Sequence, residues 1–159
     1  MSTIIGLLIA LAACSITGIQ YYGWIRKEVE FNTWNLLDLL HHRENQIDRL
    51  SVPKIIEKTK SIPFAELEPE DRACLARTSG MFVLAGILAE QRRIDLRILL
   101  PIFSYSIQDN YKHLLKYREW RETLDGYPKQ KAFDYFKELS EKARIFSDTG
   151  KIQRFRKIS

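Results

Sequence analysis

The sequence predicts an all-α protein in which a single N-terminal transmembrane helix is followed by a small cytoplasmic helical bundle. The first observation is a run of 22 residues, 4 to 25, that contains no Asp, Glu, Lys or Arg. The second is that apolar residues beyond this run recur at steps of three and four, the period of an amphipathic helix. The third is that the sustained period-two alternation of a half-buried strand occurs nowhere in the sequence.

The charge-free run predicts a retained membrane anchor over residues 1–27. As a helix the run measures roughly 33 Å, and the hydrocarbon core of a bilayer is about 30 Å thick. Leu11-Ala12-Ala13-Cys14 also has the form of a bacterial lipoprotein cleavage box, so a lipoprotein modified at Cys14 is one alternative, and a cleaved or buried segment is another. The anchor is the preferred interpretation, because no Lys or Arg precedes the run and because it continues for eleven residues past Cys14.

Five residues at the end of the run predict its orientation. Arg26 and Lys27 follow it directly, and positive charge stays on the cytoplasmic side, so the long part after them is predicted to be cytoplasmic. Tyr21, Tyr22 and Trp24 come just before, and their amphipathic rings favour the headgroup level. The sequence therefore predicts a single-pass protein of the inner membrane, with these five residues at the membrane interface and lipids as partners.

Small residues recur every four positions within the run, at Gly6, Ala10, Cys14 and Gly18. Such a stripe lets two helix backbones approach closely, which predicts helix packing between two copies. The alternative is that the spacing arises by chance, because the whole segment is rich in small residues.

The next predicted helix covers residues 28 to 50 and ends at Ser51-Val52-Pro53, because proline interrupts a helix interior. No proline separates it from the anchor, so one long helix can run from the bilayer into the cytoplasm. Its apolar positions are Phe31, Trp34, Leu36, Leu37, Leu40, Ile47 and Leu50. A short helix over 54 to 60 and a linker over 64 to 68 follow.

A further helix is predicted to begin at Pro69, with Glu70 and Asp71 in its first turn, where proline and acidic residues are favoured. Arg92 and Arg93 close it, which suits the negative end of the helix dipole. Its middle is apolar almost all round, which predicts burial at the centre of a bundle. Ten such residues are too few to span a bilayer.

Asp95 is predicted to cap another helix, which restarts at Pro101 and carries one broad apolar face. That face consists of Ile102, Tyr105, Ile107, Tyr111, Leu114, Leu115, Tyr117 and Trp120. A turn is predicted at 125–128, and the last helix covers about 129 to 146. It is predicted to bury Phe133, Phe136, Leu139, Ala143 and Phe146.

The stretch from Phe82 to Trp120, followed by residues 127 to 143, resembles an uncharacterised bacterial and phage family, the domain of unknown function numbered 4760. The similar pattern is an apolar helix ending near Ile94, a Tyr- and Arg-rich helix, a Tyr-Pro turn and a Phe-rich helix, over roughly residues 80 to 146. Members of the family combine N-terminal membrane helices with a small helical cytoplasmic domain. The resemblance implies this plan and a bacterial or phage origin, and it implies no catalytic residues.

Ser106, Asp109 and His113 come closest to a hydrolase set. On one helix Asp109 lies between the other two, whereas the histidine of a working triad lies between the serine and the acid. Ser51 and Lys54 match the Ser-x-x-Lys string of penicillin-recognising enzymes, but the companion motifs are missing from the sequence. A polar surface stripe and a turn residue are the preferred interpretations.

The remaining candidate ligands and acids do not form a recognisable site. His41 and His42 are adjacent, so they point about 100° apart on a helix and are poorly placed to share a metal. Four acidic residues precede or open a helix, where the dipole favours them: Glu66, Glu68, Glu70 and Asp71. The sequence has no Gly-rich phosphate loop and no paired cysteine spacing. It predicts no catalytic residue, metal or cofactor.

The formal net charge of +5 comes mostly from the end of the chain. The tail over residues 150–159 carries no acid, and its predicted binding residues are Lys151, Arg154, Phe155, Arg156 and Lys157. Such a segment can lie on an anionic inner leaflet. The alternatives are a solvated terminus and, less favoured, contact with nucleic acid.

These observations predict a non-enzymatic, membrane-anchored protein. Its helical cytoplasmic domain, residues 28–149, is expected to act as a scaffold or regulator by binding a protein partner or a second copy of itself. One alternative is an effector or enzyme subunit whose active site is completed by a partner chain. The other is the lipoprotein modified at Cys14.

Overall fold

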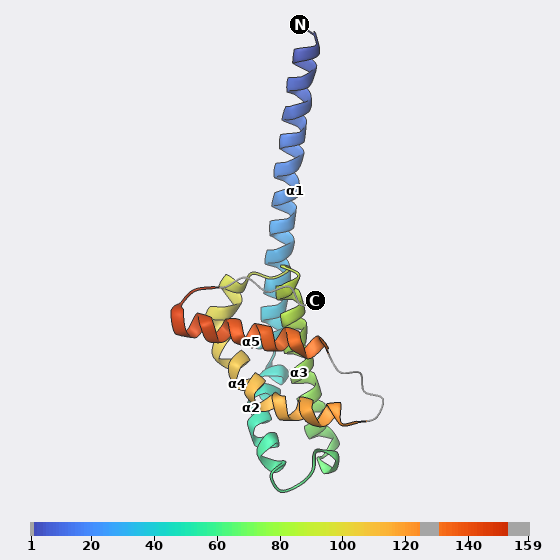
Figure 1. The fold of residues 1–159 in the computed structure, drawn as a ribbon, viewed down its shortest axis with the longest axis vertical. Coiled ribbons are helices and arrows are strands. Elements are labelled where there is room, and N and C mark those ends of the chain that lie inside the picture. Colours follow the sequence, from blue (N-terminus) through green and yellow to red (C-terminus); the bar gives the residue numbers. More distant parts are fainter. Residues whose placement is uncertain (1, 125–130, 153–159) are drawn as a thin grey trace.

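In a computed structural model, the described residues are 2–124 and 131–152, and the side chains of residues 2–14 and 16 lie outside the description. The described part is all-helical, as predicted, and contains no strand (Figure 1). Its helices are α1 (Ser2–His41), α2 (Arg43–Lys58), the short 3-10 helix η1 (Phe64–Glu66), α3 (Pro69–Glu90), α4 (Leu96–Glu122) and α5 (Lys131–Thr149).

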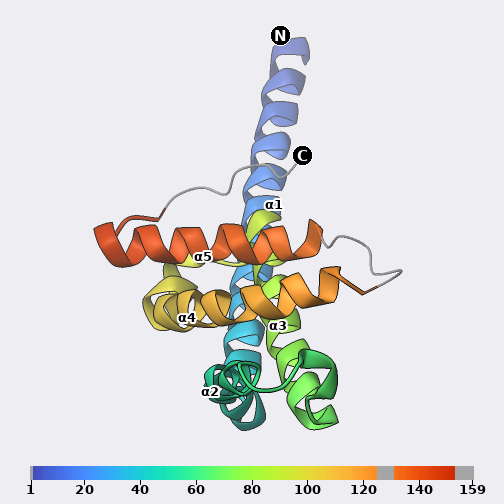
Figure 2. The ribbon, with the colours of Figure 1, turned by 60° about the horizontal axis from the view of Figure 1, so that its bottom comes forward.

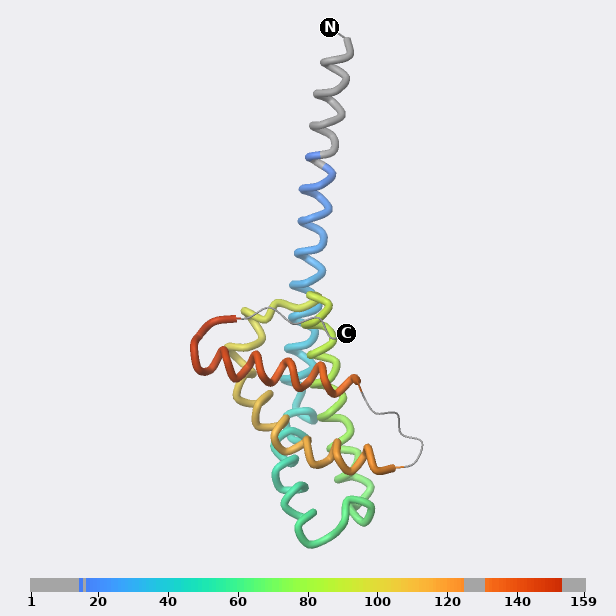
Figure 3. The backbone as a smooth tube through the Cα atoms, viewed as in Figure 1, coloured from blue at the N-terminus to red at the C-terminus, as the bar shows by residue number. Residues whose placement is uncertain are grey.

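The molecule consists of a rod and a bundle. The N-terminal part of α1, up to Lys27 and called the projecting half below, extends from the bundle, while the remainder packs among the other helices (Figures 1 and 3). α4 and α5 lie side by side and cross over α1 and α3 (Figure 2). The core between these layers is one cluster of buried side chains, centred on large residues such as Phe82, Phe133 and Phe136.

The first helix break lies at His42, so the predicted break at Ser51-Val52-Pro53 is wrong. α1 ends at His41, and α2 runs through Pro53 in its interior. The side-chain amides of Asn45 and Gln46 donate to the carbonyls of Leu39 and His41 at 2.7 Å, which satisfies acceptors that the end of α1 leaves free. Burial of Val52, Ile55 and Ile56 then holds α2 against the bundle on both sides of the proline. The short helix predicted over 54–60 is the second half of α2.

The apolar positions predicted for residues 28 to 50 divide between core and surface. Leu36, Leu37 and Leu40 are buried, as an amphipathic helix requires. The other four are exposed: Phe31 (66%), Trp34 (56%), Ile47 (54%) and Leu50 (76%). Phe31 and Trp34 lie off the stripe that α1 buries, which also contains Thr33, and Ile47 and Leu50 lie off the stripe that α2 buries.

α3 packs against α2, α4 and α5, as predicted, but its apolar middle is not buried all round, because Leu84 is 43% exposed. It begins at Pro69, and Leu75, Phe82 and Ala85 are fully buried. Among the residues with described side chains, α3 is the helix that is long and apolar enough to cross a membrane by length and composition. Of its most apolar 18 residues, 44% are buried inside the bundle. Gly86 lets α3 approach α5 closely, because a Cβ at this position would overlap the backbone carbonyl of Tyr135 on α5.

α4 begins at Leu96, five residues before the predicted restart at Pro101. The Asp95 carboxylate accepts the backbone N–H of Arg97 at 2.9 Å, so the predicted cap is confirmed. Pro101 lies inside α4, in its second turn, where it removes one backbone hydrogen bond. Burial of Leu99, Leu100 and Phe103 on both sides of the proline holds the helix in place. Ile102 and Tyr105 are 52% and 80% exposed, so the start of the predicted apolar face is wrong. The buried face begins earlier, with Leu99, Leu100 and Phe103.

α5 matches its prediction closely. It buries Phe133, Phe136, Leu139 and Ala143, and Phe146 packs against the core while partly exposed. The rings of Phe82 and Phe136 stack with centroids 5.0 Å apart, which joins α3 to α5. The turn predicted at 125–128 lies outside the described residues. The predicted linker over 64–68 holds η1 and the buried Leu67.

Candidate functional site

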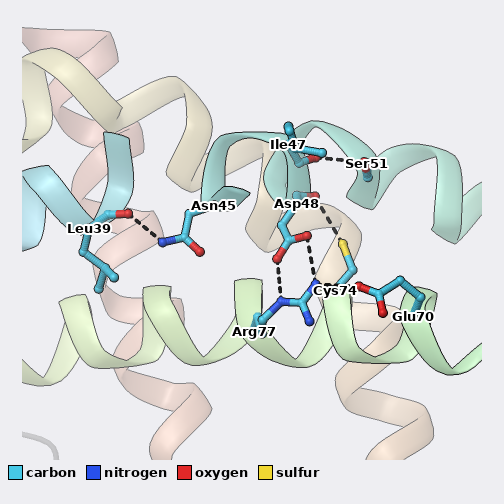
Figure 4. A network of polar contacts seen from close by, with 8 residues as sticks. All are labelled: Leu39, Asn45, Ile47, Asp48, Ser51, Glu70, Cys74 and Arg77. Carbon is cyan, nitrogen blue, oxygen red and sulfur yellow. Dashed lines mark hydrogen bonds and ion pairs between the residues drawn. The ribbon is translucent and has the colours of Figure 1, made fainter. Parts of the chain in front are cut away.

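A polar network joins α2 to α3 (Figure 4). The Arg77 guanidinium donates to both Asp48 carboxylate oxygens, at 2.7 and 3.1 Å, and to Glu70 at 3.1 Å. Asp48 is buried, and these charge-assisted bonds raise the pKa of Arg77 above its usual value. The network satisfies a buried carboxylate and fixes the two helices together, so it is structural in character.

Cys74 belongs to the same network and is not a nucleophile. Its thiol donates to the Asp48 backbone carbonyl at 3.4 Å. Burial, together with the nearby Asp48 carboxylate, raises the pKa of Cys74 to about 12. The thiol is therefore protonated at neutral pH, whereas nucleophilic cysteines need a lowered pKa.

Two cavities lie beside α4. The first, about 320 Å³, is bounded by α3, α4 and α5, with Arg118 and Arg121 on one wall. These guanidiniums are already engaged, Arg118 by Glu122 at 2.7 Å and Arg121 by the Tyr117 hydroxyl at 2.7 Å. The second, about 430 Å³, is a more open groove between α4 and α5. Neither cavity has Asp, His and Arg side chains together in its lining.

The hydrolase-like residues lie on α4 without forming a triad. The His113 ring nitrogen is 3.6 Å from the Asp109 carboxylate, one helical turn away. Ser106 is engaged by Asn110, whose side-chain amide donates to its carbonyl and hydroxyl oxygens at 2.9 and 3.4 Å. The structure therefore does not bring the serine to the histidine, in agreement with the order of the residues along the helix.

Ser51 and the two adjacent histidines also have local roles. The Ser51 hydroxyl donates to the Ile47 carbonyl within α2, which is a helical and not a turn contact. His41 hydrogen bonds to the Leu37 carbonyl at 2.9 Å, and its ring meets Phe103 edge to face. His42 occupies the break before α2.

The acidic residues around the start of α3 do not converge. Asp71 pairs with Lys58 of α2 at 2.6 Å. Glu70 pairs with Arg77, which lies two turns further along α3. Within the described part of the chain, no three His, Cys, Asp or Glu side chains lie close enough to hold a metal ion.

The five residues predicted at the membrane interface all lie on the projecting part of α1. Tyr21, Tyr22 and Trp24 are 63%, 70% and 61% exposed, and Arg26 and Lys27 follow them with exposed side chains. The Tyr21 and Trp24 rings stack with centroids 6.3 Å apart.

The small-residue stripe and the basic tail fall mostly outside the description. The side chains of Gly6, Ala10 and Cys14 are not described, while Gly18 is exposed with open space around its Cα. Lys151 is exposed after the end of α5. The other tail residues, Arg154, Phe155, Arg156 and Lys157, lie outside the described residues.

The sequence analysis missed one long-range contact, the docking of the α3–α4 connection on α1. The backbone N–H of Asp95 donates at 2.8 Å to the hydroxyl of Thr33, which is fully buried. Hydrogen bonds from Arg97 lower the pKa of Asp95, and the charge of Arg26 lowers it further. A long-range contact between residues 62 positions apart leaves no periodic signal in the sequence, so only the fold reveals it.

Comparisons with protein-family models, with curated proteins and with solved structures give no match for this chain.

Proposed function

We propose that this chain is a single-pass inner-membrane protein whose cytoplasmic helical domain acts as a scaffold or regulator by binding a protein partner or a second copy of itself. The projecting half of α1 is the observation that carries the proposal. Residues 17 to 22 and 24 to 27 are all exposed, among them Ile19 at 72% and Tyr22 at 70%. Apolar surface of this kind is unfavourable in water.

A bilayer removes that surface from water. The charge-free run of 22 residues matches the thickness of the hydrocarbon core, and a helix satisfies all its backbone hydrogen bonds internally. Trp24 and its neighbouring tyrosines fall at headgroup level, with Arg26 and Lys27 just beyond. The cations place the bundle on the cytoplasmic side in this proposal.

The interaction role is supported by two exposed aromatic side chains on the cytoplasmic side of the proposed membrane interface. Phe31 and Trp34 are 66% and 56% exposed on the part of α1 that is attached to the bundle. Large aromatic side chains of this type are enriched in protein interfaces. Members of the domain of unknown function numbered 4760 combine membrane helices with a small helical domain in the same way, and the resemblance of this chain to them remains a prediction.

Membrane extraction tests the anchor. Ala13→Arg combined with Ile16→Arg places two charges near the middle of the span, and each costs about 2.5–3.5 kcal/mol there. We expect the unaltered chain to resist carbonate washing and the double variant to appear in the supernatant. External protease added to spheroplasts should leave the unaltered bundle intact.

Three results would count against the anchor or its orientation. They are loss of the unaltered chain on carbonate washing, digestion of the bundle from outside, and a mature N-terminus at Cys14. The last result, read by mass spectrometry, would favour the lipoprotein.

Site-specific photo-crosslinking tests the interaction role. A photoreactive amino acid at Phe31 or Trp34 should give a discrete crosslinked band in intact cells, because both side chains face away from the core. The matched control is the same amino acid at Lys137, an exposed position on α5. Equal labelling from all three positions would argue against a dedicated interface on α1.

A further inference from the structure

Four exposed arginines surround the place where α1 leaves the bundle. Arg26 lies on α1, Arg92 and Arg93 lie in the α3–α4 connection, and Arg97 lies in the first turn of α4. We call these four residues the arginine cluster. We infer that the arginine cluster binds the headgroups of anionic phospholipids in the leaflet from which α1 emerges. The inference rests on the membrane anchoring proposed above.

The α3–α4 connection is fixed to the face of α1 that carries Arg26. Tyr22, Arg26 and Thr33 share one face of the helix, because they are separated by four and seven residues. The hydrogen bond from the Asp95 backbone to Thr33 attaches the connection to that face. Beyond the effect of their mutual hydrogen bonds, the charge of Arg26 lowers the pKa of Asp95, and Tyr22 raises the pKa of Arg97. Asp95 and Arg97 therefore lie near the residues of α1 that we place at the membrane interface.

The connection also lies at the right depth. It occupies the end of the bundle from which the projecting half of α1 leaves (Figures 1 and 3). Thr33 is seven residues beyond Arg26, which is roughly 10 Å along the helix axis. That distance exceeds the ~8 Å over which charges act through physiological salt, so the arginines must reach the headgroups with their long side chains. The influence of Tyr22 on the pKa of Arg97 is consistent with an Arg97 side chain that extends toward the interface residues.

The backbone at Arg92 provides a second, independent observation. Arg92 has a φ of 57°, and the next amide, that of Arg93, donates to the Leu88 carbonyl at 2.8 Å. This is a helix C-terminal motif in which glycine is the usual residue, because glycine adopts positive φ without strain. Arg92 therefore places a cation at a position where glycine would be more stable.

The arginines are available for an external anion. Arg97 pairs with Asp95 at 2.6 Å, yet its side chain is 78% exposed. Within the described part of the chain, Arg26, Arg92 and Arg93 form no ion pair with a carboxylate.

Asp95 pairs with Arg97, and Glu28, Glu30 and Glu90 lie within two to four residues of a cluster arginine in the sequence, so these carboxylates offset the charge of the cluster. The arginine cluster therefore exerts little long-range attraction on anionic lipids and binds their headgroups through direct contacts. Guanidinium groups suit this role, because they donate paired hydrogen bonds to phosphate oxygens.

The test uses the full chain in nanodiscs of phosphatidylcholine mixed with phosphatidylglycerol. Native mass spectrometry after mild delipidation measures which lipid is retained, and hydrogen exchange measures protection of residues 91–97. We expect preferential retention of phosphatidylglycerol, reduced about fivefold for each cation removed in Arg92→Gly and Arg93→Gln. Arg92→Gly should also raise the melting temperature, so affinity and stability move in opposite directions.

The matched control is Lys54→Gln with Lys137→Gln, which removes two exposed cations from α2 and α5. This control should retain phosphatidylglycerol as the unaltered chain does. Anchored protein with no preference for phosphatidylglycerol, or an equal loss in cluster and control variants, would overturn this inference and leave the anchoring intact. Failure of the chain to enter nanodiscs or to resist carbonate washing would instead overturn the anchoring itself, and the inference with it.

Discussion

The projecting half of α1 and the middle of α3 are both long apolar helical segments, and they differ in what surrounds them. α3 lies among α2, α4 and α5, and its largest side chain, Phe82, is fully buried. On α1, the described residues from 17 to 22 have no such cover and are exposed. Hydropathy alone would rank α3 as a candidate span, with a mean hydropathy of 1.3.

The difference shows that apolar composition identifies helices whose surface is unfavourable in water. Tertiary contacts determine whether that surface is buried by other helices. α3 removes its surface from water by packing in the bundle. The projecting half of α1 has no partner helix among the described residues, so under the proposed function lipid takes that place. Substitutions in the two segments should therefore have separable consequences, folding for α3 and membrane retention for α1.

Truncation of a large ring in each segment should give the largest contrast. Phe82→Ala removes a buried ring that stacks on Phe136, and we expect unfolding to be easier by about 4 kcal/mol. Trp24→Ala removes a ring that is 61% exposed, and we expect no measurable change in bundle stability. Urea unfolding in detergent, followed by circular dichroism, measures both. Equal losses would mean that the projecting segment is part of the folded core.

Two glycines of α3 sharpen the comparison within one helix. Gly86→Ala should destabilise by about 2 kcal/mol, because the new methyl group overlaps the Tyr135 backbone and α5 must move. Gly80→Ala should stabilise by about 0.5–1 kcal/mol, because nothing lies within 4 Å of the added carbon and alanine favours helix. Thermal melts of the two variants should shift in opposite directions. A shared sign would contradict the close packing of α3 on α5.

The sequence was most informative where one local rule acts alone. Proline at the start of α3 and an aspartate cap before α4 were both predicted, because each depends on neighbouring residues only. The apolar positions of α5 were predicted for the same reason, since one helix face meets the core along its whole length.

Predictions failed where tertiary contacts override a local rule. Pro53 does not break α2, because residues on both sides of it are buried and hold the helix in place. Phe31 and Trp34 are exposed because the stripe that α1 buries runs through Thr33, Leu36, Leu37 and Leu40, and an apolar spacing alone does not show that a threonine belongs to it. The docking of Asp95 on Thr33 joins distant residues, and so the arginine cluster could not be derived from spacing.

Removal of Arg77 tests the contacts that hold α2 against α3. Arg77→Gln leaves the buried Asp48 carboxylate without its two charge-assisted bonds, and we expect a loss of about 1–2 kcal/mol. Lys60→Gln is the matched control, because Lys60 pairs with Glu57 on an exposed surface where such pairs contribute about 0–0.5 kcal/mol. Chemical unfolding of both variants at neutral pH measures the difference. A control that loses as much as Arg77→Gln would show that burial of Asp48 is not the cause.

The smallest expected effect is a pH dependence that comes from Cys74. Its pKa is about 12 in the folded chain because of burial and the Asp48 carboxylate, and an unfolded thiol has a pKa of about 8.5. Between these values the folded state binds more protons, so stability falls as pH rises. We expect a loss of about 0.7 kcal/mol between pH 8 and pH 9 that Cys74→Ala removes. Cys14 is present in both chains, so the difference between their unfolding free energies isolates Cys74. Parallel pH profiles of the unaltered chain and Cys74→Ala would mean that the thiol ionises as readily in the bundle as in water. The contact between α2 and α3 would then be less tightly packed than the core around Phe82.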